Sequence, residues 1–409
     1  MRIVFVLVIF GVSVYAQSAT PLLQLIAEAQ KNNPDLHAAE HAWQAATHKR
    51  KQVSALPDPQ FTIEEFSVGS PRPFAGISNS NFAYIGIGAS QELPYPGKRR
   101  LKGEAADAAA NVQQAQLTVE QASLVEQIKT TYFRLAYLQQ TVVLLENSRT
   151  ILTQIVDTGM ARYGAGEGSQ MEVLKAQLER TKMVREITMH HEEIAQIQAD
   201  LKQLTHRPQD ASDIVAEDLQ ARSLQYSVQE LFHFARRQNP EAQMESRSIE
   251  KQLADLRSAE RQAKPDFSIG YMYQRTGLDF PSYYMLTFGV VLPRRSRVRA
   301  EIAEASESVS SARERADAVL QRKLADVQKQ YVKAASSAEL LTEYRDGLIP
   351  QAEAAFRAGL ARYESNKQTL DSVLAALNET VALKREMQQT LLDHELALAQ
   401  LEKLTGAAL

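Results

Sequence analysis

Long stretches of the chain repeat apolar residues at helical spacing. From Lys98 to about Tyr163 the sequence contains no proline and predicts a single helix of about 66 residues, roughly 100 Å long. Apolar and small residues alternate there in steps of four and three, at Leu101, Ala105, Ala108, Val112, Ala115, Val119 and Ala122. Because this heptad pattern is typical of coiled coils, we expect the helix to pack along partner helices.

Other segments alternate apolar and polar residues with a period of two, which predicts strands at 60–68, 82–92, 267–275 and 283–292. In the third strand, Phe267, Ile269, Tyr271 and Tyr273 alternate with Ser268, Gly270, Met272 and Gln274. The two strand windows, 61–95 and 267–288, hold 13 of the 28 aromatic residues. This concentration favours a sheet that faces lipid on one side. The alternative is a soluble two-layer core.

The chain contains an internal duplication. The segment ARYGAGEGSQMEVL at 161–174 recurs as ARYESNKQTLDSVL at 361–374, and Asn33-Pro34 recurs as Asn239-Pro240. Each copy of the longer motif lies between two helical segments, so each predicts the bend of a helical hairpin. The expected organisation is a signal peptide at 1–16, a first repeat at 17–205 with a hairpin at 98–205, a connector at 206–230, and a second repeat at 231–409 with a hairpin at 294–405. The outgoing helix of that second hairpin is predicted from Arg294 to about Tyr363.

The N-terminus and the composition indicate export. Arg2 precedes an apolar run from Ile3 to Val14, and Val14-Tyr15-Ala16 fits a signal-peptidase cleavage site. A run of about 12 apolar residues is too short to span the membrane as a helix. Cysteine is absent, which excludes disulfides and a lipid-anchoring cysteine. The balance of 46 basic and 49 acidic residues gives no field that would favour nucleic acid.

No catalytic or metal-binding constellation stands out, and we expect neither enzymatic activity nor a cofactor. His190 and His191 are adjacent and would point to different sides of a helix, while His37 and His41 form a pair without a third ligand. A surface position explains these histidines better than a metal site does.

A basic run follows each strand pair. The runs contain Lys98, Arg99, Arg100 and Lys102 in the first repeat, and Arg294, Arg295, Arg297 and Arg299 in the second. The helix dipole disfavours cations at a helix N-terminus, so another interaction should favour them. Binding to lipid headgroup phosphates would supply that interaction. The alternative is that these basic side chains are solvated on an exposed helix end.

Acidic residues occupy both bends. Glu172 in the first copy and Asp371 in the second lie just before the shared Val-Leu, and several copies would arrange them as a ring at a pore gate. The alternative is that they stabilise the N-terminus of each returning helix. Arg162 and Arg362, which precede the bends in matching register, are the expected partners of these carboxylates.

The duplication, the Asn-Pro pairs, the motif around ARYGAGEGSQMEVL and the terminal LEKLTG together resemble the outer membrane efflux protein family, the TolC-like outer membrane factors. The resemblance implies a mainly helical fold in which three protomers contribute four strands each to a twelve-stranded barrel, continued by helices as a periplasmic tunnel. It also implies a homotrimer in outer membrane lipid, working with a periplasmic adaptor and an inner membrane pump of the RND or ABC type. The adaptor would dock on the tips, at Gly166, Gly168, Ser169, Asn366, Lys367 and Thr369. Ser372 stands where the family pattern has the gate aspartate, with Asp371 one place earlier.

The sequence thus predicts a passive exit duct for small molecules or metal ions in the outer membrane, with a large periplasmic portion. The stretch QELPYPGKRR resembles the branch that serves heavy-metal and other cation pumps, although drug-efflux members share it. The alternatives are a type I secretion channel and, in another class, a soluble periplasmic coiled-coil adaptor or scaffold.

Overall fold

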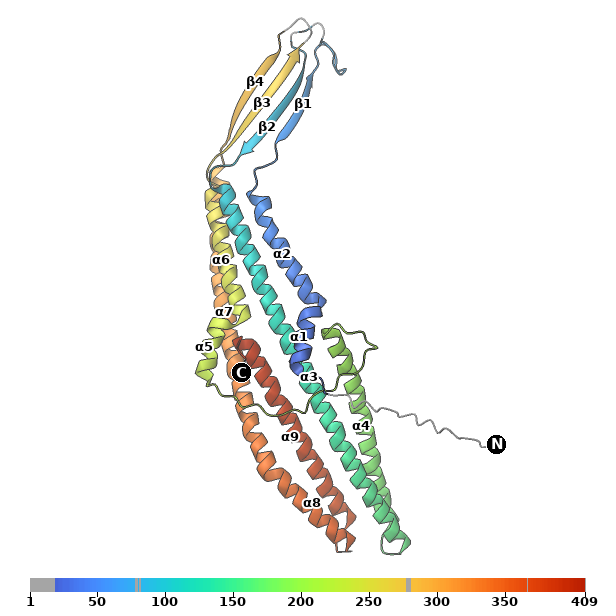
Figure 1. Cartoon of the computed structure of the whole chain (residues 1–409). Coiled ribbons are helices and arrows are strands. Elements are labelled where there is room, and N and C mark those ends of the chain that lie inside the picture. Colours follow the sequence, from blue (N-terminus) through green and yellow to red (C-terminus); the bar gives the residue numbers. More distant parts are fainter. Residues whose placement is uncertain (1–18, 78–79, 81, 277–280, 366, 409) are drawn as a thin grey trace, which may run out of the picture. The chain divides into compact units, whose positions relative to one another are not determined.

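The two halves of the chain contain the same succession of elements. The computed structural model describes residues 19–77, 80, 82–276, 281–365 and 367–408. The first half comprises α1 (Leu22–Asn32), α2 (Pro34–Ser54), β1 (Gln60–Phe66), β2 (Tyr84–Leu93), α3 (Lys98–Gly164) and α4 (Gln170–Leu204) (Figure 1). The second comprises α5 (Val228–Gln238), α6 (Pro240–Arg261), β3 (Asp266–Thr276), β4 (Tyr283–Val291), α7 (Arg295–Glu343), the π-helical turn η1 (Tyr344–Leu348), α8 (Ile349–Glu364) and α9 (Leu370–Thr405). The predicted mainly helical fold with four strands is confirmed, while the predicted signal peptide lies outside the described residues.

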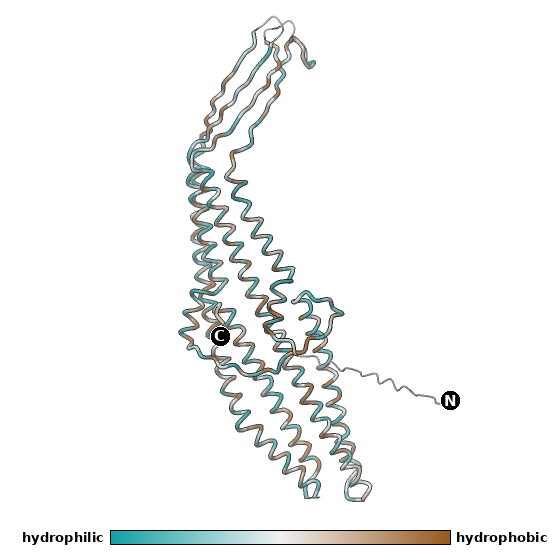
Figure 2. Tube along the Cα trace, in the orientation of Figure 1, coloured by the Kyte–Doolittle hydropathy of each residue, from teal (hydrophilic) through white to brown (hydrophobic). Residues whose placement is uncertain are grey.

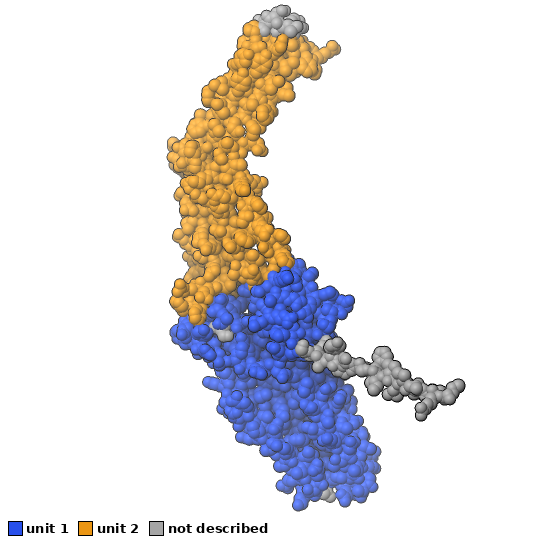
Figure 3. Space-filling model, viewed as in Figure 1, with its two compact units in different colours: residues 1–34, 122–232, 326–409 blue, residues 35–121, 233–325 orange. Residues whose placement is uncertain are grey.

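These elements form two compact units (Figure 3). The first unit contains residues 1–34, 122–232 and 326–409, and the second contains residues 35–121 and 233–325. Both α3 and α7 contribute to both units. Among the described residues, no helix combines the length and the apolar character needed to cross a membrane.

The second unit contains a single four-stranded antiparallel sheet in the order β1-β2-β3-β4. The central pair, β2 and β3, joins the two repeats, with Tyr84 opposite Thr276 and Leu93 opposite Phe267. The outer edges of β1 and β4 have no strand partner within the described part of the chain.

Hydrophilic and hydrophobic positions are interspersed along the strands (Figure 2), and the two faces of this sheet differ in polarity. Because paired residues in an antiparallel sheet point to the same side, the register sorts the side chains. One face carries the apolar residues Phe61, Ile63, Ile85, Ile87, Phe267, Ile269, Tyr271, Tyr284, Leu286, Phe288 and Val290, all of which are exposed. The other face is hollowed by a pocket of about 420 Å³ whose lining includes Gln60, Thr62, Glu64, Ser90, Glu92, Ser268 and Thr287. The predicted alternation is therefore present, and the apolar side is uncovered.

The strands join their helices through specific polar contacts in the second unit. Asp266 accepts hydrogen bonds from the backbone N–H of Tyr95, at 2.8 Å, and from the ammonium of Lys98, at 2.8 Å. Arg99 donates to the carbonyl of Ser54 at 2.8 Å. Arg261 stacks on the ring of Tyr95 and donates to the carbonyl of Pro96 at 2.7 Å. Part of the first basic run is thus used within the protein.

The first unit is organised around an apolar core between two hairpins. Segments of α3, α4, α8 and α9 supply its buried side chains, which include Leu145, Leu152, Ile155, Val156, Ala176, Met183, Ile187, Phe356, Tyr363, Leu370, Val373, Leu374, Leu377 and Val381. Side chains spaced three and four residues apart share one face of a helix. This spacing explains why each helix contributes a single stripe to the core.

The connector is fastened to the first unit by buried polar groups. Gln198 donates to the carbonyl of Ile214 at 2.6 Å and accepts from its N–H at 2.9 Å. The hydroxyl of Tyr132 donates to Thr20 and accepts from the N–H of Glu217, both at 2.8 Å. Hydrogen bonding to Arg207 lowers the pKa of Glu28.

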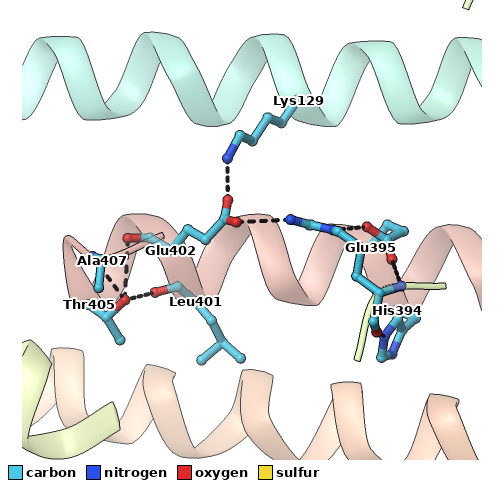
Figure 4. A network of polar contacts seen from close by, with 8 residues as sticks. Lys129, His394, Glu395, Leu401, Glu402, Thr405 and Ala407 are labelled. Atoms are coloured by element: carbon cyan, nitrogen blue, oxygen red, sulfur yellow. Dashed lines mark hydrogen bonds and ion pairs between the residues drawn. The ribbon is translucent and has the colours of Figure 1, made fainter. Parts of the chain in front are cut away.

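A charged network completes this attachment (Figure 4). Glu395 is 1% exposed and accepts two hydrogen bonds from Arg222, one from its backbone at 2.9 Å and one from its guanidinium at 2.7 Å. Glu402 bridges Arg222 and Lys129. Beside them, both ring nitrogens of His394 face backbone carbonyls, at 3.0 and 2.7 Å. A buried carboxylate requires such pairing, because an uncompensated charge in the interior is strongly destabilising.

The second long helix differs from its prediction at one place. It was predicted to be uninterrupted from Arg294 to about Tyr363, whereas the π-helical turn Tyr344–Leu348 separates α7 from α8. Pro350 follows this turn directly. Its ring lacks an N–H and clashes with the carbonyl four residues earlier, and widening the preceding turn accommodates it.

Candidate functional site

A corresponding backbone hydrogen bond is present at both hairpin bends. In the first bend the N–H of Glu167 donates to the carbonyl of Arg162 at 2.9 Å. In the second, the N–H of Lys367 donates to the carbonyl of Arg362 at 2.8 Å. Gly166 has a φ of 78°, a conformation that glycine adopts without strain. Asn366, at the matching position, lies outside the described residues.

The returning helices begin differently. Ser169 caps α4 by accepting a hydrogen bond from the N–H of Glu172 at 3.3 Å. The side chain of Thr369 makes no such cap to α9, and the hydroxyl of Ser372 instead donates to the carbonyl of Thr369 at 2.7 Å. Ser372, the residue that replaces the expected gate aspartate, is therefore engaged by the bend itself.

Arg162 joins the two tips, although not through a carboxylate. Its guanidinium lies 4.5 Å from the ring centre of Tyr363 and donates to the carbonyl of Tyr363 at 3.0 Å. Tyr363 is fully buried. The contact fixes the end of α8 against the end of α3, combining a cation–π interaction with a charge-assisted hydrogen bond.

The phenol of Tyr363 is buried, and two charged side chains lie near it. Its hydroxyl is buried without a hydrogen-bond partner among the described residues, 3.6 Å from where a Cβ on Gly159 would stand. Burial raises the pKa of Tyr363, the charge of Arg162 opposes this rise, and that of Glu172 adds to it. Glu172 thus lies within electrostatic range of the Arg162–Tyr363 contact.

The two predicted gate carboxylates have different surroundings. Asp371 accepts two hydrogen bonds from the ammonium of Lys175, at 2.9 and 2.8 Å. In the described part of the chain, Glu172 makes no ion pair, and neither does Arg362. The pairing of Arg162 and Arg362 with these acids is therefore not present in the protomer, and Lys175 takes that part for Asp371.

Polar contacts continue between α4 and α9 beyond the tip. Glu179 accepts from Asn378 at 3.5 Å, and Glu186 pairs with Arg385 at 2.9 Å. These contacts flank the apolar core and fix the register of the two helices.

The predicted docking residues lie on the surface of the bends. Gly166, Ser169, Lys367 and Thr369 are exposed, and Gly168 is half-buried against Arg162. None of the exposed four contributes to the core.

A sequence match across the first repeat supports the resemblance to a known family. A model of the outer membrane efflux protein family matches residues 25–206. The resemblance inferred from the sequence is thereby confirmed. A comparison with curated protein sequences gives no significant match.

Solved structures extend the likeness to nearly the whole chain. VceC from Vibrio cholerae superposes with a TM-score of 0.78 at 17% identity, covering 95% of this chain and 96% of VceC. The open state of the MtrE outer membrane channel of Neisseria gonorrhoeae gives 0.78 at 17% identity, covering 95% of this chain and 89% of MtrE. CusC gives 0.80 at 14% identity, covering 96% and 95%. At these identities the likeness establishes the fold.

No group of three or more His, Cys, Asp or Glu residues that could hold a metal occurs in the described ranges. His190 contacts Glu193 at 3.2 Å on the surface of α4. In the basic runs, Lys98 is buried on Asp266, and Arg100 and Arg297 pair with acids one turn further along their helices.

The sequence analysis did not single out Lys175 or Tyr363 as contact residues. The duplication could have indicated Tyr363, because it belongs to the repeated Ala-Arg-Tyr. Lys175 aligns with Ala375 and so breaks the repeat, which gives no basis for its selection.

Replacing Arg162 tests the link between the tips. Arg162→Ala removes the cation–π contact and the hydrogen bond to Tyr363, and should lower the local stability of the tip by about 2 kcal/mol. The amides of Ser365 and Lys367 should then exchange hydrogen roughly 30-fold faster. Hydrogen exchange with mass spectrometry measures this change, and Arg162→Lys should be intermediate. Unchanged exchange in Arg162→Ala would show that the contact does not hold the tip.

Proposed function

We propose that the protein is an outer membrane channel, the exit duct through which a tripartite efflux system passes small molecules or metal ions. The observation that carries the proposal is the uncovered apolar face of the sheet, opposite a polar face, in a fold shared with outer membrane channels. A soluble adaptor or scaffold would leave these exposed Phe, Tyr and Ile side chains without a role. The chain's part in export is passive, with no enzymatic step of its own.

The sheet supports a homotrimer. Four strands cannot close a barrel, and open strand edges are not tolerated in hydrocarbon, because their backbone groups would lack hydrogen-bond partners. Joining the free edge of β4 to that of β1 in the next copy satisfies both edges. Three copies then give twelve strands, with the apolar face toward lipid and the polar face toward the lumen.

The helical hairpins belong in the periplasm under this proposal. They provide the tunnel and the surface on which a periplasmic adaptor docks, linking the duct to an inner membrane pump of the RND or ABC type. The exported substrate is set by that pump.

Reconstitution tests the channel. The purified full-length protein should have the mass of a trimer in detergent and should conduct ions in planar bilayers. A stable monomer that conducts, or a trimer that never inserts and never conducts, would contradict the proposal.

The tip acids are proposed to act at the gate. Lys175 compensates the charge of Asp371, whereas Glu172 has no ion-pair partner in the described part of the chain. Glu172 therefore contributes a carboxylate at the tip that no ion pair within the described residues neutralises. Field strength at a constriction sets both ion selectivity and block by divalent cations.

Single-channel recordings can separate the two acids. Glu172→Gln should weaken cation selectivity and divalent block, because it removes the uncompensated charge. Lys175→Gln should strengthen both, because it exposes the charge of Asp371, and adding Asp371→Asn should reverse that gain. If all three variants keep wild-type selectivity and block, the acids only stabilise helix ends and the constriction lies elsewhere.

The bends are proposed as the adaptor contact. Gly166, Gly168 and Ser169 of the first bend and Asn366, Lys367 and Thr369 of the second form this docking surface. Because Gly166 has a positive φ, a bulky residue there would strain the bend as well as block docking. Lys367 is the better probe, since it is exposed and lies outside the core.

Lys367→Trp should reduce co-purification of the adaptor from membranes of the host while leaving trimer yield unchanged, because a large side chain obstructs the surface. Arg357→Trp is the matched control, on an exposed position of α8 away from the bend. Equal adaptor recovery in both variants, or equal loss, would place docking elsewhere.

A further inference from the structure

We propose that the contact between the two hairpins of one protomer is repeated between its second hairpin and the first hairpin of a neighbouring copy. In this interface Arg362 stacks on Tyr163 of the neighbour, and Glu386 pairs with Arg185 of the neighbour. The inference rests on the oligomeric channel proposed above and identifies the side chains that join its copies.

The template is the contact inside the chain. There the first hairpin supplies Arg162, which holds Tyr363, and Glu186, which pairs with Arg385 at 2.9 Å. The second hairpin supplies the tyrosine and the arginine. One face of each hairpin is used, and the two faces differ.

The duplication places the same groups on the unused faces. At an offset of 200 residues, Arg162 and Glu186 correspond to Arg362 and Glu386 on the second hairpin. Tyr363 and Arg385 likewise correspond to Tyr163 and Arg185 on the first. The second hairpin therefore carries the arginine and glutamate that the first used, and the first carries the matching tyrosine and arginine.

Exposure agrees with this assignment. Tyr363 and Leu374, which pack within the protomer, are 0% and 6% exposed. Their counterparts Tyr163 and Leu174 are 51% and 52% exposed, and the adjoining Met171 and Leu178 are 62% and 55% exposed. Met171, Leu174 and Leu178 are spaced three and four residues apart on α4, and together with Tyr163 at the end of α3 they leave exposed apolar side chains on the first hairpin, of the kind that a partner covers.

The charged groups are also available. Arg362 and Arg185 are exposed and make no ion pair within the described residues. Glu386 is exposed and accepts a hydrogen bond from the hydroxyl of Tyr344 at 3.1 Å through one carboxylate oxygen. Its other oxygen can accept from an arginine.

Space for the incoming ring is supplied by a second glycine. Gly159 borders the hydroxyl of Tyr363, and Gly359 stands at the matching position of α8. A Cβ on Gly359 would meet only the side-chain amide of Gln368 within 4 Å, at 3.6 Å. Gly359 is buried in the protomer, so Tyr163 of the next copy can enter beside it once the flexible side chain of Gln368 turns aside.

A second copy of this chain is the occupant that fits, because each unused face is complementary to the other and not to itself. Such a heterologous interface adds copies head to tail and closes into a ring when the rotation permits. At one point the two interfaces differ. The ion pair of Lys175 with Asp371 corresponds to Ala375 facing Met171, so the contact between copies is more apolar there.

Paired cysteines test the interface in the full chain, which has no native cysteine. Gly359→Cys with Tyr163→Cys should give covalent dimers and trimers on denaturing gels after treatment of outer membranes with a short bismaleimide. Gly159→Cys with Tyr363→Cys is the control and should cross-link within one chain, leaving the monomer band. If the control reacts and the first pair does not, while the mass of the complex is that of a trimer, the inference is wrong and the channel stands.

Charge exchange gives an independent measurement. Glu386→Arg and Arg185→Glu should each lower by several degrees the temperature at which the detergent-solubilised trimer dissociates, and the double variant should recover most of that loss. The matched exchange of Glu186 and Arg385 should leave the dissociation temperature unchanged. Absence of recovery in the first double variant would overturn the pairing, and a protein that is monomeric in every form would overturn the proposed channel as well.

Discussion

A backbone N–H or C=O that faces hydrocarbon without a partner costs several kcal/mol, and this constraint governs the sheet. Its four strands satisfy one another internally, but β1 and β4 end the sheet with free edges inside the described chain. In the proposed outer membrane position, the apolar face of the sheet would lie against lipid, where free strand edges are not tolerated. Several copies must therefore share one sheet if the apolar face is to be used.

The same incompleteness appears in the helical hairpins. The core of the first unit buries one stripe from each hairpin, around Tyr363 and Leu377, and leaves a stripe with Tyr163 and Leu174 exposed. A gene duplication supplies a simple origin for this state, because each hairpin inherits both faces of an original contact. Within one chain, only one of the two contacts can form.

Much of the fold could be predicted from the periodicity of apolar residues and from the turn and proline residues at the ends of the elements. The strand ends fell within two residues of prediction, because the period-two alternation stops at turn residues, and the Asn-Pro pairs marked where α2 and α6 begin. The interruption at Tyr344–Leu348 was missed, although Pro350 marks it in the sequence, because a proline inside a helical pattern does not show whether the helix ends, kinks or widens. At the tips, sequence correctly located the bends but paired the arginines with carboxylates. Those contacts depend on how α3, α4, α8 and α9 are rotated against one another, and Arg162 meets an aromatic ring and a carbonyl instead.

The π-helical turn makes the two hairpins differ in their resistance to bending. Pro350 donates no hydrogen bond to the preceding turn, so the helical ladder is weakened between α7 and α8. The corresponding stretch of α3 contains Thr150 and is continuous. A lateral load on the tips would therefore bend the second hairpin at this turn more readily than the first, although a corresponding backbone hydrogen bond closes both bends.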